Sequence, residues 1–371
     1  MEQEPKQKGG PAIVTIAAVT AVCLLLTVML TGARAHAVTA WSLTQLDYQT
    51  KGSAAVQSQV AVGDRVIPVG RAVGIKLFSD GVLVVGLSGV ETEDGAKYPG
   101  RDSGLKAGDV ITHINGDEVD TIEQIQDLLA QQEGEPLTIQ AMRGQRQLQL
   151  TAEAVENCQG VYQLGVWLRD SMAGIGTITF YDPSSGVFGA LGHGINDVDT
   201  AMLMPMESGS IMKATVSEVQ KGLSGQPGEL HGQFDLTQDM GSLYANTEQG
   251  IFGRMNSGSG LTTMEPVEVA TREEIHTGPA TILSNIRGDT VEEFAVTITH
   301  VASEAEGTRG LMVEVTDPAL LQATGGIVQG MSGSPIIQNG KLVGAVTHVL
   351  VNDPTRGYGI FIESMLKAAE N

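Results

Sequence analysis

The amino-acid sequence predicts a mainly β protein with three parts: an apolar N-terminal helix, a small α+β module and a large all-β C-terminal region. Residues 11–31 form an uncharged run of 21 residues. Residues 66–155 show short strands, one helix and turn signals, and residues 159–371 hold many short Val/Ile/Thr segments bounded by Gly, Pro, Asn or Asp. With 371 residues, the chain is long enough for two folded domains besides the leader.

Residues 1–37 are predicted to be a signal sequence or membrane anchor. A helix of about 20 apolar residues crosses the ~30 Å hydrocarbon core of a bilayer. Residues 35–37 (AHA) have the small-x-small form of a signal-peptidase site, so a cleaved signal and a retained anchor both stay open. We expect export across the cytoplasmic membrane with initial tethering, and we interpret residues 38–65 as a linker.

Charge and cysteine content exclude several function classes. The formal net charge of −21 argues against nucleic-acid binding and against broad adsorption to anionic lipid. Of the two cysteines, Cys23 lies in the leader and Cys158 has no partner in the rest of the chain, so no disulfide framework is expected. No Cys/His spacing is typical of a zinc site, and neither a metal nor a cofactor is predicted.

Residues 66–155 contain the elements of a small binding module. Residues 104–111 (GLKAGDVI) followed by an Asn-Gly pair at 115–116 predict a loop, a strand and a hairpin turn. Thr121 and Gln124 fit a helical capping box, and Ile125 belongs to the apolar stripe that follows. This pattern resembles the PDZ domain signature.

The PDZ resemblance implies a groove that binds an extended peptide between this helix and a strand edge. We place that edge at residues 74–77 and expect the groove to use five residues: Val73, Gly74, Ile75, Leu77 and Ile125. The ligand would be a partner's segment or the chain's own N-terminal or C-terminal segment. The sequence of residues 71–75 (RAVGI) departs from the usual Gly-Leu-Gly-Phe loop, and the alternative for the helical stripe is plain core packing.

Residues 330–335 (GMSGSP) are typical of a serine-protease nucleophile loop. Ser332 lies between two glycines that permit a sharp turn, and the N–H groups of Gly330 and Ser332 would face a developing oxyanion. The alternative is an ordinary Gly/Ser turn between strands.

An activated serine needs a base, and His193 is the candidate. Residues 174–181 alternate like a half-buried strand, residues 182–186 supply a turn, and the apolar run that follows ends in GALGHG at residues 189–194. The predicted hairpin thus places His193 at the end of its second strand. The alternative is a structural imidazole. Of the other histidines, His348 is notable because it follows Ser332 closely, either lining a specificity pocket or lying near the catalytic residues.

Together with residues 325–329 (GGIVQ) and 344–348 (GAVTH), these segments resemble the stage IV sporulation protein B (SpoIVB) peptidases. The resemblance implies a chymotrypsin-like double β-barrel over residues 159–371 and catalytic residues in the chain order His, Asp, Ser. It also implies a role: cleavage of the peptidase itself and of a membrane-bound regulator between forespore and mother cell. That cleavage would release an intramembrane protease to process a sigma factor.

The acid of the expected triad is Asp317, which ends a predicted strand 15 residues before Ser332 and matches the acid of the resembled family. Asp235, Asp197 and Asp199 stay open as alternatives. Asp317 has an alternative of its own, because Asp is also common as a cap or turn residue ahead of a proline such as Pro318.

The sequence therefore predicts an exported serine endopeptidase in which His193 takes the Ser332 proton and later protonates the leaving amine. The competing hypothesis is a membrane-tethered PDZ adaptor with a catalytically silent barrel. A third is a secreted protease of broad specificity.

Overall fold

The computed structural model describes residues 64–257, 265–303 and 307–370. The predicted leader, residues 1–37, lies outside these ranges, as does all but the end of the predicted linker. Within the described ranges, none of the helices has the length and apolar character needed to cross a membrane.

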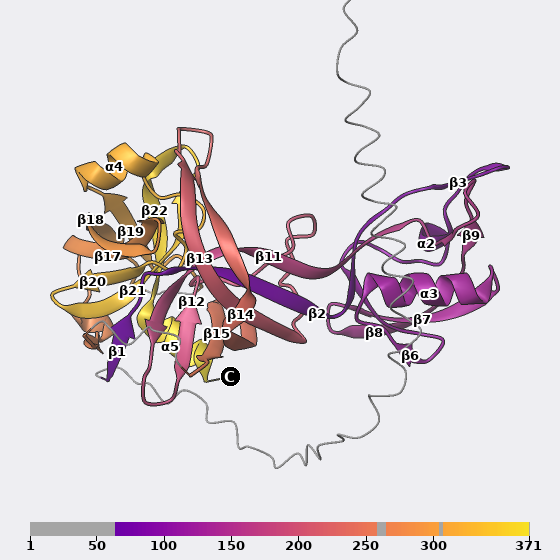
Figure 1. The fold of residues 1–371 in the computed structure, drawn as a ribbon, viewed down its shortest axis with the longest axis horizontal. Coiled ribbons are helices and arrows are strands. Elements are labelled where there is room, and N and C mark those ends of the chain that lie inside the picture. The colour runs from indigo at the N-terminus through magenta and orange to yellow at the C-terminus, as the bar shows by residue number, and fades with distance from the viewer. Residues whose placement is uncertain (1–63, 258–264, 304–306, 371) are drawn as a thin grey trace, which may run out of the picture. The chain divides into compact units, whose positions relative to one another are not determined.

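The first barrel is a closed antiparallel ring (Figure 1). Its strands pair in the order β11–β2–β13–β14–β15–β12 and back to β11. They are β2 (Ala72–Leu87), β11 (Val166–Tyr181), β12 (Val187–Ala190), β13 (Ser208–Gln220), β14 (Glu229–Thr247) and β15 (Gly250–Met255). Inward-facing apolar side chains such as Ile178, Phe188 and Ile211 fill it, as the period-2 pattern predicts.

The second barrel closes in the same way, in the order β17–β18–β19–β22–β21–β20 and back to β17. Its strands are β17 (Gly278–Arg287), β18 (Thr290–Val301), β19 (Leu311–Val315), β20 (Pro335–Gln338), β21 (Lys341–Leu350) and β22 (Asp353–Phe361). The prediction of a double barrel is thereby confirmed, but its predicted bounds of 159–371 are too narrow, because β2 of the first barrel lies at Ala72–Leu87.

Short elements connect and cover the barrels. β1 (Arg65–Pro68) pairs with β11 and with β16 (Val267–Val269), and β16 pairs in parallel with β21. A 3₁₀ turn spans Arg272–Glu274, and α4 (Pro318–Thr324) precedes the serine loop. α5 (Ile362–Ala369) buries its apolar face among barrel residues.

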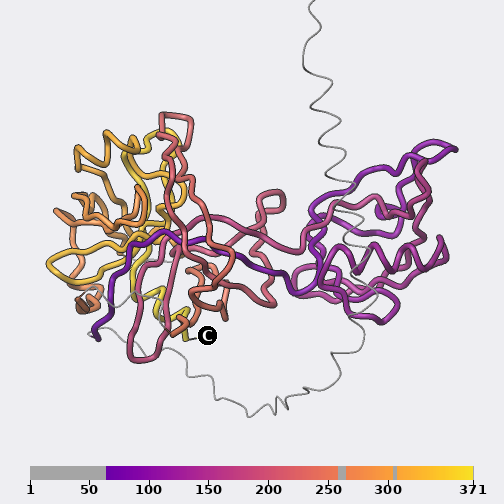
Figure 2. The backbone as a smooth tube through the Cα atoms, in the orientation of Figure 1, coloured from indigo at the N-terminus to yellow at the C-terminus, as the bar shows by residue number. Residues whose placement is uncertain are grey.

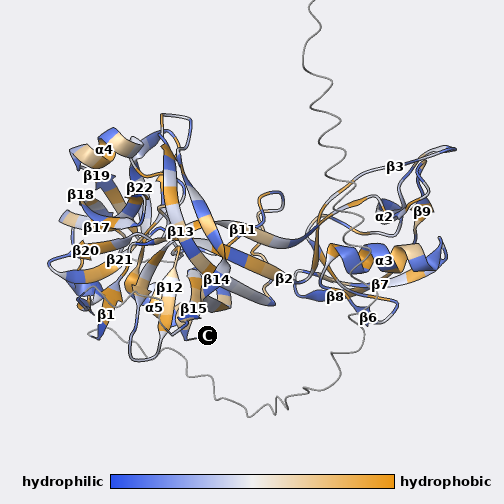
Figure 3. Cartoon of the chain, in the orientation of Figure 1, coloured by the Kyte–Doolittle hydropathy of each residue, from blue (hydrophilic) through white to orange (hydrophobic). Residues whose placement is uncertain are grey.

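The α+β module is built around α3 (Ile122–Gln132), whose hydrophobic and hydrophilic residues are coloured in Figure 3. The capping box is confirmed, since Thr121 Oγ1 accepts from the Gln124 N–H and Gln124 Oε1 accepts from the Thr121 N–H. The other elements are β3 (Val90–Thr92), β4 (Gly95–Lys97), α2 (Pro99–Asp102), β5 (Asp109–Ile114), β6 (Asp117–Glu118), β7 (Pro136–Arg143), β8 (Arg146–Glu153), β9 (Val155–Glu156) and β10 (Tyr162–Gln163).

The module is inserted between two strands of the first barrel, which the sequence did not reveal. Residues 73–78 of β2 pair with β13 in the barrel, while Val82 and Leu83 of the same strand pair with β5 in the module. β11 returns beside β2 along nearly its whole length (Figure 2). The predicted start of the module at residue 66 is therefore wrong: residues 65–78 belong to the barrels. The change of domain falls at Ser79-Asp80-Gly81, where Gly81 has a φ of +79°, but the strand continues through this segment.

Candidate active site

The serine loop of the second barrel is held by β11 of the first. Thr177 Oγ1 donates to the Gly330 carbonyl at 2.7 Å, and the Thr177 N–H donates to the Ser332 carbonyl at 3.0 Å. Thr179 Oγ1 donates to the Gly333 carbonyl at 2.8 Å. Because both threonines are buried, these bonds fix the position of the loop between the barrels.

Gly333 is required by space and by backbone conformation. Its φ is +98°, and a Cβ there would lie 2.0 Å from the Thr177 carbonyl oxygen and 2.6 Å from the Leu191 nitrogen. No side chain can be accommodated at that approach. The glycine after the serine thus serves the close contact between the loop and the first barrel.

In the described part of the chain, the turn leaves two amides of the loop without hydrogen-bond partners. The Met331 N–H donates to the Val328 carbonyl and the Ser334 N–H to the Met331 carbonyl, both within the loop. Among the described residues, neither the Gly330 nor the Ser332 N–H donates a hydrogen bond to the protein. Two unpaired amides flanking a serine hydroxyl are the donors that an oxyanion hole uses.

His193 follows β12 through a left-handed turn formed by Leu191 and Gly192, with φ of 68° and 70°. Its Nδ1 lies 2.8 Å from the Gly194 carbonyl oxygen. Because a carbonyl only accepts, this contact places the ring proton on Nδ1 and leaves Nε2 as the basic nitrogen. Burial lowers the pKa of His193 below its ordinary value, partly offset by the Gly194 hydrogen bond.

His348 on β21 is the ring neighbour of His193, with centroids 5.1 Å apart and planes tilted by 38°. Burial, together with the nearby His193 and Arg309, which act in the same direction, lowers the pKa of His348 to about 4. Its Nδ1 is buried and has no hydrogen-bond partner among the described residues. His348 is therefore neutral at pH 7 and lies beside the candidate base, as one of the two expectations for it proposed.

His193 and Ser332 line one cavity of about 290 Å³, together with Gly330. The Ser332 hydroxyl donates to the Thr347 carbonyl at 2.7 Å and must turn away from it to reach the imidazole. Catalytic hydrogen bonds, such as one between a serine hydroxyl and an imidazole, often form only when substrate is bound. The structure thus brings together the predicted base, the predicted nucleophile and the two predicted oxyanion donors.

The structure does not bring Asp317 to His193. Asp317 is the N-cap of α4: its Oδ1 accepts from the N–H groups of Ala319 and Leu320 at 2.8 and 3.1 Å, and its Oδ2 accepts from Ala295 at 3.3 Å. Burial opposes its ionisation, but these three bonds lower the pKa of Asp317 overall. The prediction of Asp317 as the partner of His193 is wrong in this structure, and the alternative of a cap ahead of Pro318 holds.

The capping role makes a specific prediction for Asp317. Asn caps helices about as well as Asp, so Asp317→Asn should keep peptidase activity within a few-fold of wild type. Asp317→Ala removes the cap and should lower the free energy of unfolding by about 1 kcal/mol, measured by denaturant titration. A triad acid would behave differently, because replacing it by Asn costs about 10⁴-fold in rate.

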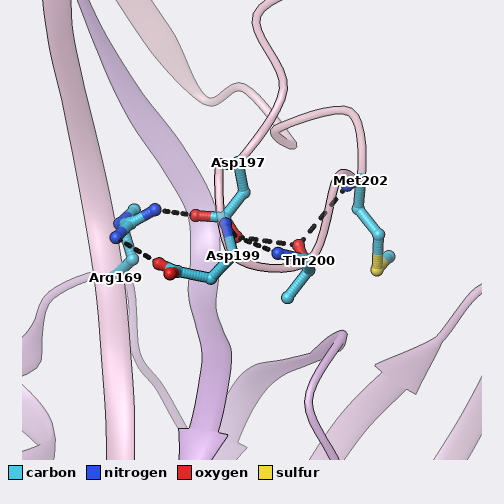
Figure 4. A network of polar contacts seen from close by, with 5 residues as sticks. All are labelled: Arg169, Asp197, Asp199, Thr200 and Met202. Carbon is cyan, nitrogen blue, oxygen red and sulfur yellow. Dashed lines mark hydrogen bonds and ion pairs between the residues drawn. The ribbon is translucent and has the colours of Figure 1, made fainter.

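The other candidate acids are also engaged elsewhere, and Figure 4 shows the contacts of two of them, Asp197 and Asp199. Arg169 pairs with Asp197 and, at 2.7 Å, with Asp199, and Asp197 Oδ1 accepts from the N–H and hydroxyl of Thr200. Asp235 accepts from the N–H and hydroxyl of Thr237. Among the described residues, the hydrogen bond of the His193 ring is to the Gly194 carbonyl, not to a carboxylate.

Asn246 is a positioning residue that sequence reasoning missed. Its Oδ1 accepts from the Ile195 N–H at 2.9 Å, and its Nδ2 donates to the Ile195 and Met204 carbonyls at 3.1 and 2.9 Å. It therefore closes the base of the loop that follows His193. A lone Asn in a strand carries no motif that would have identified it.

The predicted peptide-binding strand is wrong. Val73, Gly74, Ile75 and Leu77 pair with β11 on one side and β13 on the other, so this segment has no open edge. The side chains of Val73, Ile75 and Leu77 are buried in the barrel. Both hydrogen-bonding edges are used by the closed ring.

A different segment lies opposite α3. A cavity of about 1110 Å³ is bounded by α3, including Ile125, and by residues 160–168. Gly165 has a φ of +66°, and a Cβ there would lie 2.5 Å from the Ser88 carbonyl oxygen. Among the described residues, the N–H groups of Leu164 and Gly165 donate no hydrogen bond within the chain. The sequence feature that could have identified this segment is the apolar-Gly-apolar run at residues 164–167 (LGVW), which lies beyond the predicted module boundary.

Cys158 is exposed, and its thiol donates weakly to the Glu91 carbonyl at 3.4 Å. In the described ranges, His, Cys, Asp and Glu side chains form no group suited to a metal ion.

Comparison with protein families gives two matches. The family model described as SpoIVB peptidase S55 matches residues 160–366, and a PDZ domain model matches residues 95–143. A search of curated proteins finds no match.

Solved structures of two kinds resemble the chain. The active form of the Rv3671c protease from M. tuberculosis is 14% identical, covers 54% of this chain and 73% of its own, and has a TM-score of 0.30. The thermostable serine protease AL20 from an extremophilic microorganism is 12% identical over 54% of this chain and 90% of its own, with a TM-score of 0.31. The PDZ domain of an SdrC-like protein from Listeria monocytogenes is 25% identical over 24% of this chain and 87% of its own, with a TM-score of 0.20.

Proposed function

This chain belongs to the SpoIVB peptidase S55 family, whose model matches more than half of it, and we propose that Ser332 and His193 are its nucleophile and general base. The observation that carries this proposal is that both side chains line the same cavity, beside the N–H groups of Gly330 and Ser332, which have no hydrogen-bond partner among the residues that the structure describes. The chain is a serine peptidase with a PDZ domain.

In the proposed reaction, His193 Nε2 accepts the Ser332 proton as Oγ attacks a peptide carbonyl carbon. The carbonyl oxygen becomes an oxyanion that the Gly330 and Ser332 N–H groups stabilise. The C–N bond then breaks as His193 returns the proton to the leaving amine, and water completes hydrolysis of the acyl-enzyme by the same route. The Gly194 carbonyl holds the productive tautomer in place of a carboxylate.

We further propose a restricted biological role. The chain acts after export, initially tethered by residues 11–31, and cleaves itself and a membrane-bound regulator of an intramembrane protease, which starts a sporulation signalling cascade. Support comes from the family match, the uncharged N-terminal run and the PDZ module inserted within the catalytic barrel. The site of action would be the space between forespore and mother-cell membranes.

The PDZ module is proposed to bind a peptide with a free apolar C-terminus in the cavity beside α3. The stretch from Val166 to Arg169 pairs with β2 on one edge only, so among the described residues its other edge is open to an added strand. The N–H groups of Leu164 and Gly165, which are unpaired within the described ranges, would receive the terminal carboxylate.

Peptide titration tests the groove. Ala130 is an exposed α3 residue that lines the cavity, whereas the neighbouring Gln131 is exposed outside it. Ala130→Arg should weaken binding of a fluorescent peptide ending in an apolar residue at least ten-fold, while Gln131→Arg should leave it unchanged. Equal affinity for the peptide and for its C-terminal amide would contradict carboxylate capture.

The cellular role is tested by comparing N-termini of membrane proteins from cells that make the full chain or its Ser332→Ala variant. A restricted enzyme should generate a few new N-termini, in the chain itself and in one membrane regulator, and should leave casein intact. Rapid casein digestion would favour a broad-specificity protease. Full function in the Ser332→Ala variant would favour the adaptor hypothesis.

A further inference from the structure

The cavity beside Ser332 is walled mainly by aliphatic side chains. Besides the catalytic residues, the side chains that bound it include Ile75, Met172, Ile175, Leu191 and Ile195. We propose that this cavity takes one apolar side chain of the substrate, from a residue flanking the scissile bond, and that Met172 and Gly174 set its size. The inference rests on the proposed role of Ser332 and adds the substrate class.

The chemistry of the walls favours an apolar residue over a charged one. None of the residues lining the cavity is Asp, Glu, Lys or Arg, although the chain as a whole carries a net charge of −21. A substrate lysine or glutamate would be buried there without a charged partner, which is costly. The polar side chains Asn196 and Gln329 are exposed, so they lie where they can remain in contact with water.

The volume suits a single side chain. Whole small-molecule sites occupy about 300 to 1,000 Å³, so a cavity of about 290 Å³ is too small for an extended peptide. Burying a Leu, Met or Phe side chain is worth about 1.5 to 3 kcal/mol. Discrimination of about 10- to 200-fold against smaller residues follows from contacts of that kind.

Gly174 keeps the cavity open. It lies directly opposite Ile75 across β11 and β2, and cross-strand partners point to the same face. Two residues further along the same face, a Cβ at Gly176 would meet Leu191 and Ile75 within 2.8 Å. A Cβ at Gly174 would meet nothing within 4 Å, and Gly174 does not have the left-handed φ that strains other residues. Gly174 lines the cavity and is exposed, so the space beyond it opens to solvent and is available to a substrate side chain.

Cut-site profiling of the full chain with a proteome-derived peptide library tests this proposal. Wild type should cut at sites where one flanking position is enriched in Leu, Met, Ile or Phe. Gly174→Leu should shift that position to Gly or Ala and lower kcat/KM for a leucine-containing peptide about 10- to 100-fold. Ser171→Leu, which adds the same side chain to β11 outside the cavity, should leave the profile unchanged.

Labelling of Ser332 by a small fluorophosphonate shows whether a negative result contradicts the proposed pocket or the proposed role of Ser332 as nucleophile. Wild type, Gly174→Leu and Ser171→Leu should label equally; absence of label in wild type would overturn the role of Ser332 itself. If Gly174→Leu does not fold, Met172→Ala provides the test. This variant should enlarge the cavity and shift the preferred substrate residue toward Phe and Trp. Three results would each overturn the proposed apolar pocket. They are a preference for charged residues at both flanking positions, a cut-site profile that does not change in the variants, and a wild type that is labelled but cuts no library peptide.

Discussion

Ser332→Ala should reduce peptide cleavage by about 10⁴-fold or more, because the only atom removed is the one that attacks the carbonyl. The measurement is intact-mass spectrometry of the full chain incubated alone, together with kcat/KM for a library-derived peptide. Fragments that form in wild type should be absent in the variant. In the structure the hydroxyl donates to the Thr347 carbonyl. Because the net contribution of one such hydrogen bond is small, its loss should change the free energy of unfolding only slightly.

Ser334→Ala is the matched control. Ser334 lies two residues from Ser332 in the same loop, but its hydroxyl is buried and bonds to Ser284 Oγ at 3.2 Å. This variant should retain activity within a few-fold. A Ser332→Ala chain that still processes itself, or a Ser334→Ala chain that is inactive while folded, would contradict the assignment of the nucleophile.

His193→Ala should have the second-largest effect, again about 10⁴-fold, because the Ser332 hydroxyl is a weak nucleophile without its base. Catalytic residues that act as a unit are not additive, so the double variant with Ser332→Ala should be no slower than either single variant. His348→Gln, which changes the ring neighbour without removing the base, should cost much less. Equal losses in His193→Ala and His348→Gln would mean that the two imidazoles have been assigned to the wrong roles.

The pH dependence of cleavage follows from the burial of His193. A base must be neutral to accept the serine proton, and burial lowers the pKa of His193 below the ordinary value of about 6.5. The neutral form therefore persists as the pH falls through 6.5, and the rate should decline only at lower pH. A kcat/KM profile whose acid limb has its midpoint above 6.5 would contradict the buried, neutral base.

The sequence was most informative where geometry leaves little choice. Glycines around Ser332 and His193 indicate sharp turns, and the structure shows why: Gly333 approaches the Thr177 carbonyl too closely for any Cβ. Alternating apolar residues likewise predicted the barrel strands. Turns and strand alternation depend on residues that are close together in the sequence, so one amino-acid sequence is enough to predict them.

Features that depend on distant partners were not predictable. An Asp at the end of a strand before Pro318 looks the same whether it caps a helix or orients a histidine, and only the contacts of Asp317 decide. The tautomer of His193 is held by a backbone carbonyl, which has no sequence signature. The peptide-binding edge was misplaced for a related reason, because pairing with β13 occupies the edge of β2 at Gly74.

The most direct test of the account is to map a fluorophosphonate label on the full chain by peptide mass spectrometry. The account predicts label on Ser332 in wild type, strong loss of labelling in His193→Ala, and undiminished labelling in Asp317→Asn and Ser334→Ala. Label on another residue, or loss of labelling in folded Asp317→Asn, would contradict a site in which His193 acts on Ser332 without a carboxylate partner.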